Sequence, residues 1–425
     1  MDAVTPARSR FASILPAERP AVLWAFLYFF SILCGYYTLR PLRDEMGIIG
    51  GVRNLPWQFT ATFVVMLIAV PFYSAVVARF PRRTIIPLVY RFCAVNLLGF
   101  LLLDRAGVSE VWVARVFFVW VSVFNLFVVS IFWSFMVDTF KAEQGKRLFG
   151  AIAAGGSLGA IAGPALAALL VKPFGRAALY VAAAVLLEAA VFCVRRLIGW
   201  AGAHEAGGVG RSPDRPVGGG VLAGFRLALA SPYLLAIAGM MLAYTITSTV
   251  IYADQARIVS ATIQDSSTRT ALFARIDLWV NVVALVAQTL ATGWVLTVLG
   301  LGVALCVLPI LTAGGFLGLG LAPGLATLVA VQIARRGIQY GLERPSREVL
   351  YTVVSSEEKY KAKAFIDTVV FRGGDAAAIW AYDAVRSIAP PASAVTAAML
   401  VVCAGWIGVA LFAARRHAGF VRRDT

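Results

Sequence analysis

Residues 112–136 read WVARVFFVWVSVFNLFVVSIFWSFM, and Arg115 is the only charged side chain among them. An α-helix rises about 1.5 Å per residue, so this stretch is long enough to cross the roughly 30 Å of hydrocarbon in a bilayer. The stretch therefore predicts a transmembrane helix.

Eleven other stretches of similar length and composition lie along the chain. The chain has 425 residues, of which 60% are hydrophobic and 14% are charged, and its mean hydropathy is +0.81. A soluble protein carries roughly 45–50% apolar and about 25% charged residues. The sequence therefore predicts an all-α integral membrane protein of about twelve transmembrane helices. The other expected spans are 21–40, 57–78, 85–103, 148–171, 177–197, 232–252, 271–297, 301–322, 324–341, 364–385 and 393–414.

The spans fall into two sets of six, separated by the polar stretch 198–225. Its core, GGVGRSPDRPVGGG at 207–220, has the composition of a flexible linker. This arrangement resembles the six-plus-six plan of the major facilitator superfamily, in which the substrate lies between two halves near the middle of the bilayer. The expected parts are a cytoplasmic N-terminal segment 1–20, a six-helix bundle 21–197, a cytoplasmic linker 198–225, a second six-helix bundle 226–414 and a basic cytoplasmic tail 415–425.

The formal net charge of the chain is +16. Cytoplasmic loops of membrane proteins collect Lys and Arg, so this charge does not call for a nucleic-acid partner, and we expect none. If the N-terminus is inside, the cytoplasmic segments hold 23 of the 38 Lys and Arg residues, whereas the outer segments hold 9. The bias predicts a multi-pass protein of the bacterial inner (cytoplasmic) membrane with both termini in the cytoplasm.

The end of the first expected span carries the first candidate site. A charge at the centre of a membrane helix costs about 2.5–3.5 kcal/mol on insertion scales, so it needs a partner, water or a function. Arg40 and Arg43 share a helix face if the helix continues past Pro41. In one interpretation they face a cavity beside Tyr37 and clamp an anion. In the other they reach the outer interface, with Asp44 as partner.

Two adjacent arginines, Arg335 and Arg336, lie deep in the tenth expected span with no acidic residue within four positions. This pattern indicates either a contact with the substrate or a salt bridge to the other half. Asp254 and Arg257 are spaced for an outer salt bridge. Further candidates for salt bridges or ion coupling are Arg275, Asp277, Asp367, Arg372 and Asp375.

Three stretches resemble the ATP/ADP translocase family of nucleotide carriers. They are Tyr37-Thr38-Leu39-Arg40 through Arg43-Asp44, Phe132-Trp133 through Asp138 with Gly145-Lys146-Arg147, and Glu358-Lys359 through Asp367 with Arg372-Gly373-Gly374. The resemblance implies a nucleotide or another phosphorylated metabolite as substrate, contacted by Arg43 and Lys363. The family's acidic residue in helix 4 falls on Val121 here, with Asn125 nearby, so strict exchange of ATP for ADP is not implied.

The leading hypothesis is a secondary active transporter of an anionic solute, working by alternating access with exchange or ion coupling. A second hypothesis is a proton-coupled facilitator for a non-nucleotide small molecule, with Asp277, Asp367 and Asp375 as proton sites. A third is a non-transport membrane subunit or scaffold. The chain has no Walker loop and no HExxH pattern, so we expect neither an enzyme nor a cofactor.

The cysteines fall inside apolar spans without the spacing of metal ligands, and we interpret them as packing residues. We therefore expect no metal site. The partners that the sequence leads us to expect are the lipid bilayer and a small anionic solute, with the chain working as a monomer. The cysteines are Cys34, Cys93, Cys193, Cys306 and Cys403.

Overall fold

The computed structural model describes residues 14–79, 82–204, 231–355, 362–363, 365–388 and 392–424, and within them every regular element is a helix. The linker core and most of the N-terminal segment 1–20 lie outside the described residues. The chain divides into two compact units. The first is Met1–Met46, Val65–Gly210 and Ser266–Leu278, and the second is Gly47–Val64, Arg211–Asp265 and Trp279–Thr425.

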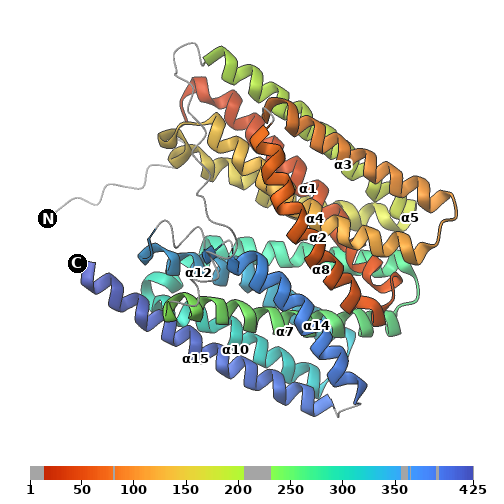
Figure 1. The fold of residues 1–425 in the computed structure, drawn as a ribbon, viewed down its shortest axis with the longest axis vertical. Helices are drawn as coiled ribbons and strands as arrows, with labels where there is room; N and C mark the ends of the chain where they lie inside the picture. Colours follow the sequence, from red (N-terminus) through yellow and green to blue (C-terminus); the bar gives the residue numbers. More distant parts are fainter. Residues whose placement is uncertain are drawn as a thin grey trace. The chain divides into compact units, whose positions relative to one another are not determined.

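The first half of the chain forms five long helical elements (Figure 1). The longest contains two helices in succession, because Gly175 interrupts it with φ 67° and ψ −171°, a conformation that glycine adopts without steric cost. The elements are η2 (Pro16–Glu18), α1 (Arg19–Ile49), η3 (Val52–Asn54), α2 (Leu55–Arg79), α3 (Arg82–Arg105), α4 (Glu110–Thr139) and α5 (Ala142–His204).

The second half is also helical, but π-helical turns interrupt several of its helices. The elements up to the first break in the described chain are α7 (Pro232–Thr262), α8 (Ser266–Val286), the π turn η4 (Ala287–Ala291), α9 (Thr292–Trp294), the π turn η5 (Val295–Leu299) and α10 (Gly300–Leu321). They continue with α11 (Leu325–Ile338), the π turn η6 (Gln339–Glu343), α12 (Arg344–Leu350), η7 (Tyr351–Val353), the π turn η8 (Ile366–Val370), α14 (Phe371–Ser387) and α15 (Ala392–Asp424).

Eight stretches of the described chain are long and apolar enough to cross a membrane. Two of them, Arg147–Gly202 and Ser266–Leu321, are 56 residues long. A helix of that length would measure about 84 Å, enough for two crossings. The first is broken at Gly175, and the second is broken at Gly300, where φ is 82°. These eight stretches therefore account for ten crossings.

The other two expected spans, 324–341 and 364–385, correspond to α11–α12 and to η8–α14. Each carries ionic side chains, such as Arg335 and Arg372, that lower its hydropathy. The prediction of about twelve membrane helices is therefore confirmed, with each expected span on a helix of its own.

Three helices run further than the sequence suggested. α1 continues to Ile49 rather than ending near residue 40, and α7 continues to Thr262 rather than 252. The tenth helix continues through η6 and α12 to Leu350 rather than ending near residue 341. These helices continue past the expected spans into polar residues, and in the structure several of those residues have partners on other helices.

The glycines of α5 allow close packing on α1 within the first unit. A Cβ atom at Gly159 would lie 2.5 Å from the carbonyl oxygen of Phe30, and one at Gly163 would lie 2.5 Å from that of Cys34. Small residues at this spacing let two membrane helices approach backbone to backbone.

The segment GGSLG at 155–159 also fits the GxSxG pattern of hydrolases. It lies in the middle of a helix rather than at a strand-to-helix turn, so it does not present a nucleophile.

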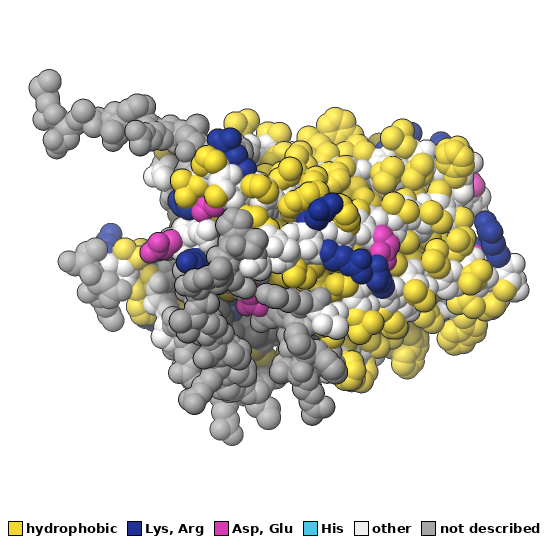
Figure 2. All heavy atoms as spheres, turned by 90° about the horizontal axis from the view of Figure 1, so that it is seen from above, with side chains coloured by type: hydrophobic (Ala, Val, Ile, Leu, Met, Phe, Trp, Pro, Cys, Tyr) yellow, Lys and Arg dark blue, Asp and Glu magenta, His cyan; other side chains and the backbone are white. Residues whose placement is uncertain are grey.

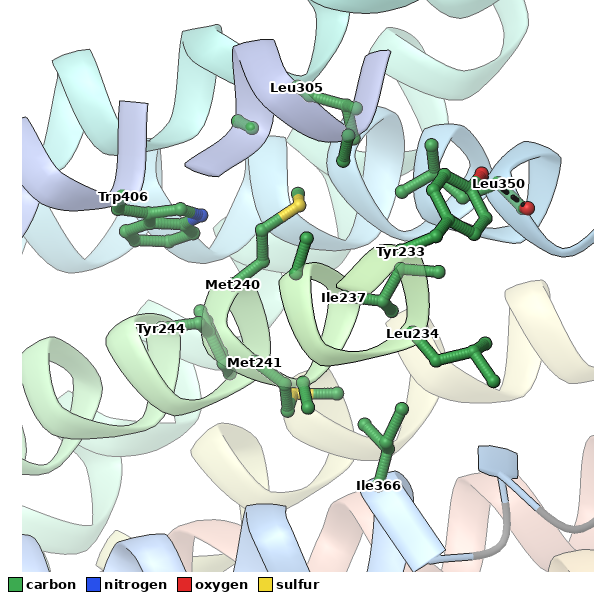
Figure 3. Packing of buried hydrophobic residues seen from close by; sticks show 14 of the residues in the cluster. Tyr233, Leu234, Ile237, Met240, Met241, Tyr244, Leu305, Leu350, Ile366 and Trp406 are labelled. Atoms are coloured by element: carbon green, nitrogen blue, oxygen red, sulfur yellow. Dashed lines mark hydrogen bonds between the residues drawn. The ribbon is translucent and has the colours of Figure 1, made fainter. Parts of the chain in front are cut away.

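In the second unit, α15 packs against α10 and α7, and α14 packs against α7 (Figure 1). The core between them includes Ile237, Met240 and Trp406, all of which are buried (Figure 3). The hydroxyl of Tyr233 donates a hydrogen bond of 2.7 Å to the carbonyl oxygen of Leu350. This bond joins the beginning of α7 to the end of α12.

The outward faces of the helices are apolar. Large hydrophobic side chains such as Phe72, Leu102, Leu169 and Leu321 are exposed, the last of them 86%. Hydrophobic side chains likewise cover much of the face drawn in Figure 2, and charged ones are scattered. A water-soluble protein rarely exposes large continuous apolar surface, so these helices fit a lipid environment.

Candidate functional site

Each unit contains a cluster of ionisable side chains that come from its expected spans. The first-unit cluster is built on α1 between Tyr37 and Glu45, with side chains from α4 and the beginning of α8. The second-unit cluster is built on α7, α11, α12 and α14.

Arg40 in the first-unit cluster is paired with a buried acid. Its Nη1 lies 3.7 Å from Oδ1 of Asp277, and the side chains of the two residues are 16% and 1% exposed. The guanidinium also lies 5.7 Å from the centre of the Tyr37 ring. The sequence named Arg40 and Asp277 for separate roles, as a substrate contact and as a coupling residue, and the structure brings them together.

Arg43 is held by three neighbours of different chemistry. Its guanidinium lies 4.0 Å from the centre of the Phe118 ring, which is within the range of a cation–π interaction. Its Nε donates to Oγ of Ser122 at 2.9 Å, and its Nη1 donates to Oδ1 of Asp44 at 3.0 Å. Both α4 partners lie on the helix that also carries the half-buried Asn125. The pairing with Asp44 anticipated in the sequence is present, but it lies within the helix rather than at its end.

Glu45 is a member of this cluster that the sequence analysis missed. Its side chain is fully buried, and Arg269 donates from Nη2 and from Nε to its two carboxylate oxygens, at 2.7 Å and 2.8 Å. Such a two-pronged pair is the strongest geometry for an arginine and a carboxylate. The sequence signal was an acidic residue next to Asp44, hidden because we expected the helix to end before it.

Arg335 in the second-unit cluster is almost completely buried, at 2% exposure. Its Nη2 donates to Oγ of Ser248 at 3.2 Å, and its guanidinium lies 5.7 Å from the centre of the Tyr244 ring. Its Nε and Nη1 atoms are buried and have no hydrogen-bond partner among the described residues. Arg336 beside it is 8% exposed. The site thus contains a buried guanidinium group whose Nε and Nη1 donors form no hydrogen bond with the described residues.

Two further polar contacts connect α7 with its neighbours near Arg335. Gln332 on α11 donates from Nε2 to Oε1 of Gln255 at 2.5 Å. Asp375 on α14 accepts a hydrogen bond of 3.0 Å from Thr249 and lies 3.6 Å from Arg372. Asp375 and Arg372 are therefore joined as the sequence suggested, inside the same unit.

The end of the tenth helix contributes residues that sequence reasoning missed. Glu343 and Arg347 are buried and lie 3.4 Å apart, in an i, i+4 arrangement. Glu348 pairs with Lys363, whose Nζ lies 2.7 Å from both carboxylate oxygens. The signal was present as Glu343, Arg344, Arg347 and Glu348, which follow the expected end of the tenth span at residue 341. The resemblance named Lys363 as a substrate contact, and in this structure it already has an acidic partner.

Asp254 is the centre of a network where α7 and α14 both end. The hydroxyl of Tyr382 donates to Oδ1 of Asp254 at 2.5 Å, and Nη1 of Arg257 lies 3.4 Å from the same oxygen. Arg386 approaches it to 3.9 Å. A cavity of about 890 Å³ lies beside this network, and Arg53 is also one of its lining residues. The Asp254–Arg257 pair expected from the sequence is therefore one part of a larger network.

Two other candidates from the sequence have exposed side chains. Arg275 on α8 and Asp367 on η8 are both exposed. Among the described residues no group of three or more His, Cys, Asp or Glu side chains could hold a metal ion. The cysteines are free thiols.

Arginine guanidinium groups are prominent in both clusters. Their guanidinium groups are fixed by aromatic rings and hydroxyl groups, a setting in which arginine binds carboxylate or phosphate oxygens. In the first unit each arginine already has a carboxylate. In the second unit Arg335 has none among the described residues.

Several solved structures match this fold over nearly the whole chain. A bacterial homologue of the iron transporter ferroportin, in an inward-facing state, matches with a TM-score of 0.66 and 12% sequence identity, covering 95% of this chain and 99% of that one. An auto-inhibited peptide transporter of the POT family has a TM-score of 0.63 and 13% identity, over 95% and 97% of the two chains. A bacterial metal transporter has a TM-score of 0.57 and 14% identity, over 96% and 99%.

No protein-family model and no curated protein matches the sequence. At 12–14% identity the structural likeness establishes the fold. The fold is the one that these transporter structures share, and it agrees with the six-plus-six arrangement of spans. These comparisons lend no support to the ATP/ADP translocase family in particular.

Proposed function

We propose that this membrane protein, whose fold is that of the major facilitator superfamily, is a secondary transporter of a small anionic solute. It would work by alternating access, exposing a binding site first to one side of the membrane and then to the other. The residues proposed to contact the solute are Arg335 and Arg336 in the second unit, and Arg40 and Arg43 in the first.

The observation that carries the proposal is the condition of Arg335. A charged side chain inside a membrane helix is costly unless it is paired or serves a function. Arg335 is 2% exposed, has two unbonded donor atoms and has no carboxylate partner among the described residues. An anion that enters the site would supply both the missing charge and the missing acceptors.

Within this class, we propose a nucleotide or another phosphorylated metabolite as the solute. The resemblance of the Tyr37–Asp44 and Glu358–Asp367 stretches to the ATP/ADP translocase family supports this choice. The planar guanidinium groups support it as well, because they match phosphate oxygens in pairs.

The test is uptake by proteoliposomes containing the purified full chain. Labelled nucleotides, sugar phosphates, dicarboxylates and neutral sugars would be compared, with wild type, Arg335→Gln and Arg335→Lys. Hydrogen bonds to charged groups contribute about 1.5–3 kcal/mol, so Arg335→Gln should lower kcat/KM for the anion by about ten- to hundred-fold. Arg335→Lys should recover little, because an ammonium group cannot reproduce the planar fork.

Arg275→Gln is the matched control, because Arg275 is an exposed arginine of α8. It should transport the anion at close to the wild-type rate. Uptake of a neutral solute only, or full anion uptake by Arg335→Gln, would contradict the proposal.

A further inference from the structure

The π turn η6 in the tenth helix ends on a buried acid, Glu343. A π turn is a rare, locally widened part of a helix, found frequently at functional sites. Side chains stabilise this one: Thr292 donates to the carbonyl oxygen of Gly341 at 2.6 Å, and Ser346 donates to that of Leu342 at 2.7 Å. The fold therefore maintains an irregular backbone at the point where it places a carboxyl group in its interior.

The surroundings of Glu343 supply few hydrogen-bond partners for an ionised carboxylate. Its side chain is 2% exposed, its Oε1 lies 3.4 Å from Nη1 of Arg347, and its Oε2 has no hydrogen-bond partner among the described residues. Glu45 shows the contrast, because Arg269 bonds both of its oxygens at 2.7 and 2.8 Å. A buried carboxylate needs that kind of complete pairing, whereas the neutral acid loses much less on burial. The surroundings of Glu343 thus favour the protonated acid.

The charges around Glu343 allow it to change its protonation state. Arg347 interacts electrostatically with Glu343 and also with the exposed Asp367. When Glu343 is protonated, Asp367 remains as a second acidic group that interacts with Arg347. α10 and η4, which also pack against η6, contain no ionisable side chain apart from Cys306. The ionisable groups of the other neighbouring elements include Arg335, Arg336, Tyr340, Arg344, Glu348, Tyr351, Cys403, Arg415, Arg416 and His417. Tyr244 of α7 also interacts electrostatically with Glu343.

We propose that Glu343 is a proton-binding site, and that the chain couples the movement of a proton to that of its solute. Glu343 holds the proton in the conformation described here. It releases the proton to water, leaving a carboxylate, in a conformation that brings Arg347 closer. The coupling rests on the proposed transport function, but the proton site can be tested without a solute.

The first test uses dicyclohexylcarbodiimide, which reacts with protonated carboxyl groups in apolar surroundings. The full chain in lipid would be treated across a series of pH values, and the modified peptides identified by mass spectrometry. Glu343 should be modified, and the extent should fall as the pH rises. Glu348 of the same helix is the internal control and should stay unmodified, because both of its carboxylate oxygens accept hydrogen bonds of 2.7 Å from Nζ of Lys363. Arg347→Gln should move the fall to more alkaline pH, because a neighbouring cation favours the carboxylate.

Infrared difference spectroscopy gives an answer that does not depend on access by the reagent. A protonated carboxyl group has its own carbonyl stretching band, and this band should be lost in Glu343→Gln. Loss of the band supports the proposal even if the reagent does not reach Glu343. If Glu343→Gln removes no such band, the proposal is overturned. Neither measurement involves solute uptake, so failure of the Arg335 experiment would leave this result standing.

Discussion

Arg269 and Glu45 form a buried, two-pronged ion pair, in which Nη2 and Nε of the arginine lie 2.7 Å and 2.8 Å from the two carboxylate oxygens. The pair joins α1 to the beginning of α8 within the first unit, and 224 residues separate its members. Glu45 is fully buried and Arg269 is 12% exposed. Each charge is therefore satisfied by the other rather than by water.

Breaking this pair should destabilise the protein strongly. Removing one partner of a buried ion pair costs about 3–5 kcal/mol, because the other charge is left uncompensated. We expect Arg269→Ala and Glu45→Gln each to lower the Tm in detergent. Unfolding can be followed with a thiol-reactive fluorophore, since Cys34 and Cys193 are buried in the fold.

The matched control for this prediction is the pair formed by Lys363 and Glu348, which lies between two expected spans and whose side chains are 33% and 43% exposed. Ion pairs exposed to water contribute about 0–1 kcal/mol, so Glu348→Gln should hardly change the Tm. Equal losses for the buried and the exposed pair would show that the Arg269–Glu45 contact does not stabilise the fold.

Replacing the α5 glycines that contact α1 with alanine should weaken the packing of α1 against α5. At Gly159 and at Gly163 a Cβ atom would lie 2.5 Å from a carbonyl oxygen of α1, so the helices would have to separate. We expect Gly159→Ala and Gly163→Ala to destabilise the protein by about 1–3 kcal/mol each. Gly150→Ala on the same helix is the control, because a Cβ there meets no atom within 4 Å. If all three variants have the same Tm, the close approach of α1 and α5 is not what these glycines provide.

Arg43 and Lys363 should respond differently to the charge of the solute. The guanidinium group of Arg43 packs on the Phe118 ring in the first-unit cluster and is proposed to contact the solute. Arg43→Gln should therefore raise the KM for a multiply charged phosphate by about ten- to hundred-fold, and raise it less for a monoanion. Lys363 is paired with Glu348 and is therefore expected not to contact the solute directly. Lys363→Ala should change the KM for multiply charged and singly charged solutes by the same factor.

Glu348→Gln is the companion variant for Lys363. It should reproduce the effect of Lys363→Ala, because each variant removes one side of the same ion pair. A selective loss of multiply charged solutes in Lys363→Ala, absent from Glu348→Gln, would show instead that Lys363 contacts the phosphate directly.

The orientation in the membrane can be tested with reporter fusions. The distribution of Lys and Arg predicts a cytoplasmic location for a reporter placed after residue 210, which lies outside the described residues, and for one at the C-terminus. A reporter inserted at residues 263–265, between α7 and α8, should lie on the other side. A cytoplasmic result at 263–265, or an outer one at either of the other positions, would reject the proposed topology.

The sequence alone determined the membrane fold and the number of its helices. The apolar stretches are local features, because crossing a bilayer requires about twenty suitable residues in a row, whatever the rest of the chain does. The Arg372–Asp375 and Asp254–Arg257 pairs were predictable for the same reason, since each lies within one turn of a helix.

Only the tertiary structure decided how the remaining charges are satisfied. Nothing in the local sequence of Arg40 indicates Asp277, and nothing near Glu45 indicates Arg269, because those partners come from a helix more than two hundred positions away. The same contacts explain why α1 continues past residue 40, since polar groups that find partners on another helix need not leave the membrane. Arg335 and Glu343 keep buried polar atoms without a hydrogen-bond partner among the described residues, and that too depends on which helices pack around them.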